Sequence, residues 1–214
     1  MNKKDNISEL ITNYANLTKA SDNFLPVVTK IPVTGKVLDE EDIHNAIDAC
    51  LDAWLTSGDY QDKFEKAISN YLNLRHTLMV NSGSSANLLA LTGLKIFNNL
   101  QGGDEVITCS VGFPTTINPI IQNGLVPVLI DVDLKTLNIL PDLIEKSITN
   151  KTKGIVIAHT LGNPFQLDDI KKICETYNLF LMEDNCDAFS SKYGDDFTGT
   201  FGDVSTLSFY PAHH

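Results

Sequence analysis

From His76 onward, short apolar runs alternate with helical patterns, and this alternation constrains the fold more than any other feature. The apolar runs predict strands at His76–Val80, Glu105–Thr108, Val126–Asp131, Gly154–His159, Leu179–Glu183 and Ser205–Phe209. The stretches between them predict helices near Ser84–Asn99, Thr115–Gln122, Pro141–Thr149 and Leu167–Tyr177. Near-continuous apolar strands separated by amphipathic helices are typical of an α/β fold, with a mainly parallel sheet and helices on both faces. Such a fold places its ligand sites at the carboxyl ends of the strands.

The residues before this alternation predict a separate N-terminal arm. Residues 1–35 are polar and mixed, and a helical pattern with acidic residues in its first turn then runs from Leu38 to Leu55. Residues 36–214 are expected to form the large domain. This domain stops directly after the Ser205–Phe209 strand and one loop, although an α/β domain needs more chain to close its site. We therefore expect the N-terminal part of a longer enzyme, with an incomplete large domain and a small C-terminal domain outside this chain.

Charge and composition narrow the classes of function. The net charge of −11, without a cluster of lysine or arginine, argues against nucleic acid or an anionic membrane as a general partner. No apolar run approaches bilayer-spanning length and no signal-peptide core follows Met1, so a cytoplasmic protein is the simplest interpretation. The four cysteines, Cys50, Cys109, Cys174 and Cys186, lack CxxC pairing and zinc-ligand spacing, so we expect free thiols and no metal site within the chain.

The segment Asn81-Ser82-Gly83-Ser84-Ser85-Ala86-Asn87 is a candidate phosphate-binding site. It follows a predicted strand and opens a predicted helix, so backbone N–H groups, hydroxyls and the positive helix end could meet a phosphate there. Taken alone, an ordinary capped turn explains the same residues, since Ser and Gly are common at helix starts.

Three other positions are candidates for holding an aromatic cofactor. Asp184 ends the Leu179–Glu183 strand, where a carboxylate could pair with a pyridinium nitrogen; a magnesium ligand or a solvated aspartate is the alternative. Phe113 follows Gly103-Asp104-Glu105-Val106-Ile107-Thr108 and could stack on a ring, or it could be an ordinary core residue. Ser208 adds a hydroxyl at another strand end, or is simply a buried serine.

Together these motifs resemble the sugar aminotransferases of the fold-type I, pyridoxal-phosphate-dependent family over most of residues 36–214. The resemblance rests on Gly-Ser-Ser-Ala, Gly-Asp-Glu-Val-Ile, the aromatic Phe113, Glu-Asp-x-x-x-Ala and the Ser-Phe-x-Pro of Ser208–Pro211. It implies that Gly83, Ser84 and Ser208 contact the cofactor phosphate and that Phe113 stacks on the ring. It also implies that Asp184 meets the ring nitrogen and that Asp187 lies near the ring hydroxyl, where many members have glutamine or histidine.

His213 stands where this family places the lysine that binds its cofactor covalently. A histidine cannot form that link, but its near-neutral pKa suits proton transfer. The exchange resembles the branch of 3-dehydrases that remove the C3 hydroxyl of nucleotide-linked 4-keto-6-deoxyhexoses, in 3,6-dideoxysugar and O-antigen biosynthesis. That resemblance implies pyridoxamine 5'-phosphate (PMP) as the cofactor, His213 as the catalytic residue, a CDP-linked sugar as substrate and a homodimer. It further implies a [2Fe–2S] cluster, reduced by an NADH-dependent iron-sulfur flavin reductase, with its cysteine ligands beyond His214.

Two alternatives remain at this point. One is a GDP-4-keto-6-deoxymannose 3-dehydratase, or another lysine-less homologue of the aminotransferases, which needs no cluster and regenerates its cofactor with glutamate. The other is a non-catalytic fragment that binds cofactor or pairs with another subunit.

Overall fold

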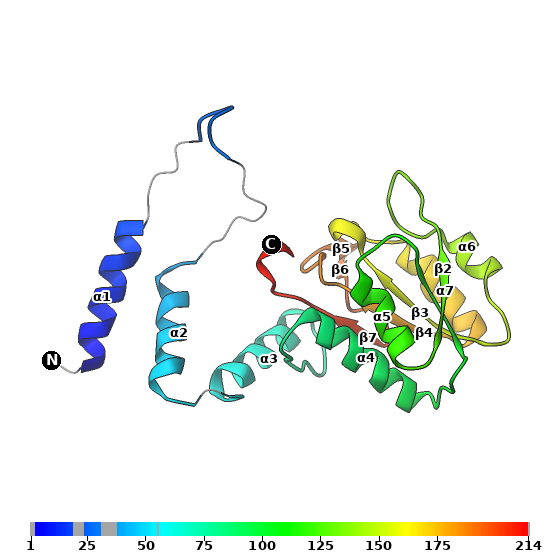
Figure 1. The fold of residues 1–214 in the computed structure, drawn as a ribbon, viewed down its shortest axis with the longest axis horizontal. Helices are drawn as coiled ribbons and strands as arrows, with labels where there is room; N and C mark the ends of the chain where they lie inside the picture. The colour runs from blue at the N-terminus through cyan, green and yellow to red at the C-terminus, as the bar shows by residue number, and fades with distance from the viewer. Residues whose placement is uncertain (1–2, 19–23, 31–37, 55, 214) are drawn as a thin grey trace.

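A computed structural model describes residues 3–18, 24–30, 38–54 and 56–213. The first helices are α1 (Lys3–Thr18), α2 (Glu40–Leu51) and α3 (Asp59–Tyr71). Helix α2 begins where the Asp39 side chain accepts hydrogen bonds from the Glu41 and Asp42 amides, a capping box that satisfies N–H groups without helical partners. In Figure 1, α1 and α2 lie side by side at the end of the molecule opposite the sheet.

The α/β body contains a five-stranded parallel sheet in the order β2-β1-β3-β4-β7. Its strands are β1 (Glu105–Cys109), β2 (Val126–Ile130), β3 (Thr152–Ala158), β4 (Phe180–Asp184) and β7 (Val204–Thr206). The neighbours β3 and β4 are in register with Ala158 opposite Asp184, and β4 and β7 with Asp184 opposite Thr206. The carboxyl ends of three adjacent strands therefore lie side by side at one edge of the sheet.

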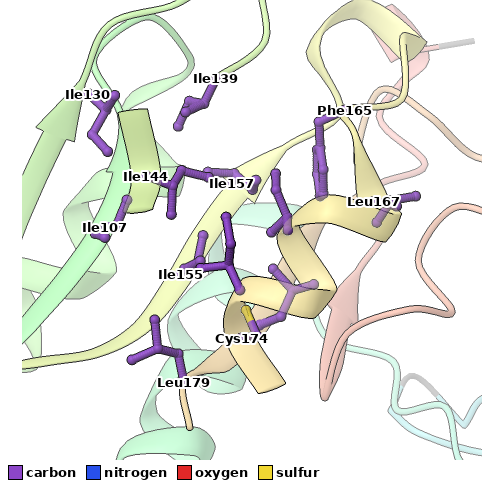
Figure 2. Close-up of a cluster of buried hydrophobic side chains, with 13 residues drawn as sticks. Ile107, Ile130, Ile139, Ile144, Ile155, Ile157, Phe165, Leu167, Cys174 and Leu179 are labelled. Atoms are coloured by element: carbon purple, nitrogen blue, oxygen red, sulfur yellow. The ribbon is translucent and has the colours of Figure 1, made fainter. Parts of the chain in front are cut away.

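Helices cover both faces of the sheet, which confirms the predicted fold class (Figure 1). Helices α4 (Gly83–Phe97) and α5 (Pro114–Gln122) pack on one face, and α6 (Pro141–Lys146) and α7 (Leu167–Tyr177) pack on the other. Successive residues of a strand point to opposite faces, so Val156 of β3 packs with α4 and α5 while its neighbours Ile155 and Ile157 pack with α6 and α7. Figure 2 shows this second core, in which Ile144, Leu167 and Cys174 of the two helices surround the isoleucines of the sheet.

The predicted strand His76–Val80 is wrong. These residues form no ladder in the described part of the chain, and the Met79 amide donates to the Glu65 side chain at 2.7 Å. An apolar run becomes a strand only through a hydrogen-bonded neighbour, and none of the described strands pairs with this segment. The last predicted strand, Ser205–Phe209, is also shorter than expected, because β7 ends at Thr206.

The structure also contains helices and strands that the sequence did not predict. The predicted N-terminal arm contains the helix α1, while residues 1–2, 19–23 and 31–35 of that arm lie outside the described residues. Helix α3 and the short antiparallel pair β5 (Lys192–Tyr193) and β6 (Asp196–Phe197) were not predicted. Two short 3-10 turns, η1 (Thr160–Gly162) and η2 (Pro211–His213), follow β3 and β7. None of the described helices is both long enough and apolar enough to span a bilayer.

Candidate functional site

The start of helix α4 closely approaches the segment that follows β7. Ser82 caps this helix by accepting a 3.2 Å hydrogen bond from the Ser85 amide, so Gly83 and Ser84 occupy its first turn. A Cβ atom added to Gly83 would lie 2.9 Å from Ser208 Cβ and 3.2 Å from Cys186 Sγ. Only a glycine fits between these side chains, which leaves the first-turn N–H groups of α4 beside the Ser208 hydroxyl.

Two of the three residues predicted to contact the cofactor phosphate, Gly83 and Ser208, lie against each other although they are far apart in the sequence. Their contact with a phosphate stays a prediction. Ser208 is buried, and its Oγ accepts from the Tyr210 amide at 3.3 Å. Ser84 is exposed on the same helical turn, and no described hydrogen bond of its side chain ties it to Gly83 or Ser208. The turn could thus hold an anion through backbone N–H groups and the helix dipole.

Asp184 lies at the carboxyl end of β4 and is only 5% exposed, so it is not the solvated aspartate that the sequence left open. Its Oδ2 accepts from Thr116 Oγ1 at 2.7 Å and from Asn87 Nδ2 at 2.8 Å. Its Oδ1 accepts from the Cys186 amide at 3.3 Å. Among the described residues, no lysine, arginine or histidine forms an ion pair with this carboxylate, so its donors are all uncharged. A buried carboxylate with neutral donors suits a ligand that brings its own positive charge.

Cys186 separates Asp184 from Asp187 and is an inert thiol. Burial raises its pKa, and the neighbouring carboxylate of Asp184 raises it further. The group therefore stays protonated and is neither a nucleophile nor a ready ligand for a metal.

His213 and Asp187 are in direct contact, because the Nδ1 atom of the histidine donates to Oδ1 of the aspartate. The two side chains are 27% and 42% exposed, so the pair faces solvent at the sheet edge. Hydrogen bonding to a carboxylate fixes which imidazole nitrogen carries the proton and orients the ring. The structure thus joins the predicted catalytic residue to a predicted cofactor-binding residue.

Aromatic contacts hold the segment that carries His213. Phe209 packs edge-on against Phe64 of α3, with ring centroids 5.1 Å apart, and against Phe189 at 5.4 Å. Tyr71 of α3 joins the same group through Phe189. Such contacts stabilise beyond their buried area and restrict the path of the chain after β7.

Phe113 lies directly before α5, with 69% of its surface exposed, so it is not a core residue. It lines a small pocket at the carboxyl ends of β1 and β3, shared with Cys109, Thr116, Thr160 and Phe165. Thr116, which lines the same pocket, donates to Asp184. The stacking of Phe113 on a cofactor ring stays a prediction.

Sequence reasoning missed three polar residues that surround Asp184 from other elements: Asn87, Thr116 and Thr206. Asn87 lies on the buried side of α4 with Leu91 and Leu94, so an amide interrupts an apolar stripe with helical spacing. The sequence shows that Asn87 interrupts the stripe. It does not show the hydrogen-bond partners of Asn87, which lie at least 28 positions away along the chain.

A second buried group missed by sequence reasoning joins Glu183 and His159. His159 Nε2 donates to Glu183 at 2.9 Å, both side chains are fully buried, and the imidazole stacks on Phe165 with centroids 4.1 Å apart. The carboxylate also accepts from the amides of Gly199, Phe201 and Gly202 at 2.8, 2.8 and 2.6 Å. Burial raises the pKa of Glu183, but the bonds from His159 and these amides outweigh burial and lower it. This group ties the 199–202 loop to the sheet.

The cysteines do not assemble into a metal site in the part of the chain that the structure describes. Cys50 lies on α2, whereas Cys109 ends β1. Burial raises the pKa of the Cys174 thiol to about 12. No group of three or more His, Cys, Asp or Glu side chains among residues 3–18, 24–30, 38–54 and 56–213 could hold a metal ion. The chain's own residues do not fit an iron-sulfur cluster, whereas the glycine-lined helix start and the buried Asp184 do fit a phosphorylated ring with a positive nitrogen.

Comparisons with known proteins agree with this chemistry. A model described as the DegT/DnrJ/EryC1/StrS aminotransferase family matches residues 37–214. Lipopolysaccharide biosynthesis protein RfbH of Salmonella typhimurium is 48% identical, with 100% of this chain and 50% of the relative covered. The dTDP-4-dehydro-2,6-dideoxy-D-glucose 3-dehydratase of Saccharopolyspora spinosa is 49% identical, with 99% and 46% covered.

Solved structures are similar over the same portion. The E coli GDP-4-keto-6-deoxy-D-mannose-3-dehydratase with bound hydrated PLP superposes with a TM-score of 0.75 at 34% identity, covering 81% of this chain and 45% of that chain. The chain thus spans about half the length of the curated relatives it matches.

Proposed function

The chain belongs to the DegT/DnrJ/EryC1/StrS aminotransferase family, and from this premise we propose that it serves the C3 dehydration of a nucleotide-linked 4-keto-6-deoxyhexose. Relatives named as 3-dehydratases of dTDP- and GDP-linked sugars support the reaction type. The relative named for lipopolysaccharide biosynthesis supports a role in making 3,6-dideoxysugars for O-antigen. The absence of a transmembrane helix among the described residues is compatible with the cytoplasmic location that we propose.

The observation that carries this proposal is the contact between His213 and Asp187. Both residues lie at the carboxyl edge of the sheet, one after β7 and the other after β4, and those two strands are neighbours. The family resemblance puts a lysine at position 213 in transaminating members. An imidazole held there can move a proton but cannot bind a carbonyl cofactor covalently.

The proposed cofactor is PMP, which when bound would supply an amine for the C4 ketone of the sugar and an electron-accepting ring. The helix start at Gly83 and Ser84, together with Ser208, would hold its phosphate. Asp184 would meet its ring nitrogen, Phe113 would stack on the ring, and Asp187 would lie near the ring hydroxyl. PLP-bound neighbours in the same fold support a cofactor of this class.

The chain's own residues divide the proton chemistry between them. Asp187 accepts from Nδ1 of His213, which orients the imidazole so that its Nε2 would act as the base for a proton on the bound cofactor. The same carboxylate stabilises the resulting imidazolium. His213 then can return a proton to the hydroxyl that leaves C3. General acid-base catalysis of this kind contributes roughly 100- to 10,000-fold in rate.

The proposal also covers the nucleotide of the substrate, the oligomeric state and the redox partners. The resemblance favours a CDP-linked sugar, a homodimer, a [2Fe–2S] cluster and an NADH-dependent iron-sulfur flavin reductase. Since the described cysteines do not fit a cluster, no step of the mechanism is assigned to one.

The test is a single-turnover reaction of the PMP-loaded protein with CDP-, dTDP- and GDP-linked 4-keto-6-deoxyhexoses, followed by mass spectrometry. We expect loss of water from the CDP-linked sugar and, for His213→Asn, a rate reduced by roughly 100-fold or more. His44→Asn on α2 is the matched control, because it changes a histidine whose side-chain partners are Ser8 and Glu40, both outside the sheet. A His213→Asn protein that eliminates water at the unaltered rate would disprove the assigned role.

The rival function is 3-dehydration of GDP-4-keto-6-deoxymannose with glutamate as the amino donor. Its support is the structural similarity to the E coli enzyme. Turnover of the GDP-linked sugar that depends on glutamate and not on a reductase would favour the rival. Failure to bind PMP at all would favour the non-catalytic fragment instead.

A further inference from the structure

Asn87 is a buried amide that links four elements of the fold. It is 1% exposed, and its Nδ2 donates to Asp184 Oδ2 on β4 at 2.8 Å and to the Thr115 carbonyl on α5 at 3.2 Å. Its Oδ1 accepts from Thr206 Oγ1 on β7 at 2.6 Å. Both hydrogens of the amide are therefore used, and its oxygen is also bonded, so a residue that begins on α4 has one fixed orientation.

These bonds determine which oxygen of Asp184 remains available to a ligand. Asn87 and Thr116 both donate to Oδ2, at 2.8 and 2.7 Å, whereas Oδ1 accepts a longer bond of 3.3 Å from the Cys186 amide. Thr116 is also the third residue of α5, so the positive end of that helix lies beside the carboxylate. These donors, which come from two different helices, fix the rotation of the Asp184 carboxylate.

The position of Asn87 makes a purely structural role a poor explanation. Leu91 and Leu94 share its buried face on α4, and a leucine at position 87 would continue that stripe. An amide buried there is tolerated only if its polar atoms are bonded, and one of its bonds goes to Asp184, the buried carboxylate of the candidate cofactor site.

We propose that Asn87, held by Thr206, is a positioning residue that sets the orientation of the Asp184 carboxylate toward a protonated ring nitrogen. This inference rests on the proposed function, because it takes PMP as the ligand of Asp184. Asn87 acts through Asp184 and has no assigned contact with the substrate.

The test uses PMP labelled with ¹⁵N at its ring nitrogen, bound to the full chain. Calorimetry gives the Kd, and ¹⁵N NMR across a pH series gives the midpoint of ring deprotonation. We expect Asn87→Leu to weaken binding about 10-fold and to lower that midpoint by about one pH unit, because the Asp184 carboxylate is no longer held in the orientation that meets the ring nitrogen. Thr116→Val should act in the same direction.

Thr92→Val is the matched control, because it removes a hydroxyl from the same helix. Its Oγ1 donates to the Leu88 carbonyl at 2.7 Å and to Asn123 at 3.2 Å, and it has no bond to Asp184. Both readouts should stay at the unaltered values. A general destabilisation of α4 would change Thr92→Val and Asn87→Leu alike, and that result would overturn the proposal.

Thr206→Val is a second variant that tests the same role if Asn87→Leu does not fold. It removes the hydroxyl that holds the amide and should shift Kd and midpoint in the same direction by a smaller amount. Unaltered values in whichever of these two variants folds would overturn the positioning role and leave the proposed function standing. If the unaltered protein does not bind PMP, both proposals fail together.

Discussion

His213 donates from Nδ1 to the carboxylate of Asp187, which lies 26 positions earlier in the chain. The contact forms because β4 and β7 are adjacent parallel strands, so the segments that leave their carboxyl ends emerge side by side. Edge-on packing of Phe209 against Phe64 and Phe189 then keeps the second segment close to the first. His213, the predicted proton-transfer residue, therefore follows a strand whose neighbour ends in Asp184.

Replacing His213 by lysine should restore a covalent link to the cofactor. We expect His213→Lys with pyridoxal phosphate to show an absorption band that borohydride abolishes, because a lysine amine reacts with the aldehyde and an imidazole does not. His44→Lys on α2 is the control and should show no such band. If His213→Lys binds the cofactor without the band, position 213 is not the lysine position of the family.

Replacing Asp184 by asparagine should weaken cofactor binding about 10- to 100-fold, because a buried charge-assisted bond to the ring nitrogen is lost while the shape is kept. Equilibrium dialysis with PMP measures this, and single-turnover elimination should slow as well. Asp168→Asn, on the exposed first turn of α7, should leave both unchanged. An unchanged single-turnover rate in Asp184→Asn would remove Asp184 from the ring-nitrogen role.

Adding one methyl group at Gly83 should disturb the predicted phosphate-binding site at the start of α4. The new Cβ of Gly83→Ala would lie 2.9 Å from Ser208 Cβ, so we expect a loss of about 1–3 kcal/mol in the free energy of unfolding and weaker binding of PMP. Gly93→Ala on the same helix has no atom within 4 Å of its new Cβ and should stabilise by about 0.5–1 kcal/mol. Equal effects of the two substitutions in urea unfolding would show that the crowding at Ser208 has no consequence.

Glu183 should make the protein sensitive to acid. Its pKa in the fold is lowered from the ordinary value of 4.5, so in the window below 4.5 the unfolded chain binds the proton first. The stabilisation is fully present above 4.5 and is lost as the pH falls through the lowered pKa. Glu183→Gln should flatten this dependence in urea unfolding and lower stability at neutral pH by roughly 3 kcal/mol.

The control for that measurement is Glu145→Gln, which changes an exposed carboxylate that accepts from Tyr177 at 3.0 Å. It should keep the acid dependence of the unaltered protein. A Glu183→Gln protein with the same slope of stability against pH would show that the carboxylate titrates alike in the folded and unfolded chains.

The strands and helices from β1 to α7 could be predicted because their signals are local. The strand β4 begins with the apolar run Phe180–Met182, and α7 spans the predicted Leu167–Tyr177 without change. The segment His76–Val80 carries the same kind of local signal, but strand formation depends on a neighbour, and the Met79 amide bonds to Glu65 instead. Helix α3 was missed because polar residues outnumber apolar ones along Asp59–Tyr71, and Ile68 is the one residue of this helix that is buried.

The sequence by itself determined the α/β class, and a family resemblance in it predicted the residues of the candidate site, with His213 at the position of the family's lysine. Only the tertiary structure decided that Asp184 is buried among neutral donors, that Gly83 touches Ser208, and that His213 is paired with Asp187. The physical reason is the distance along the chain over which each effect acts. Hydrophobic periodicity and helix capping depend on residues only a few positions apart. Burial, pairing and pKa depend on side chains that the sheet brings together from positions as far apart as Asn87 and Thr206.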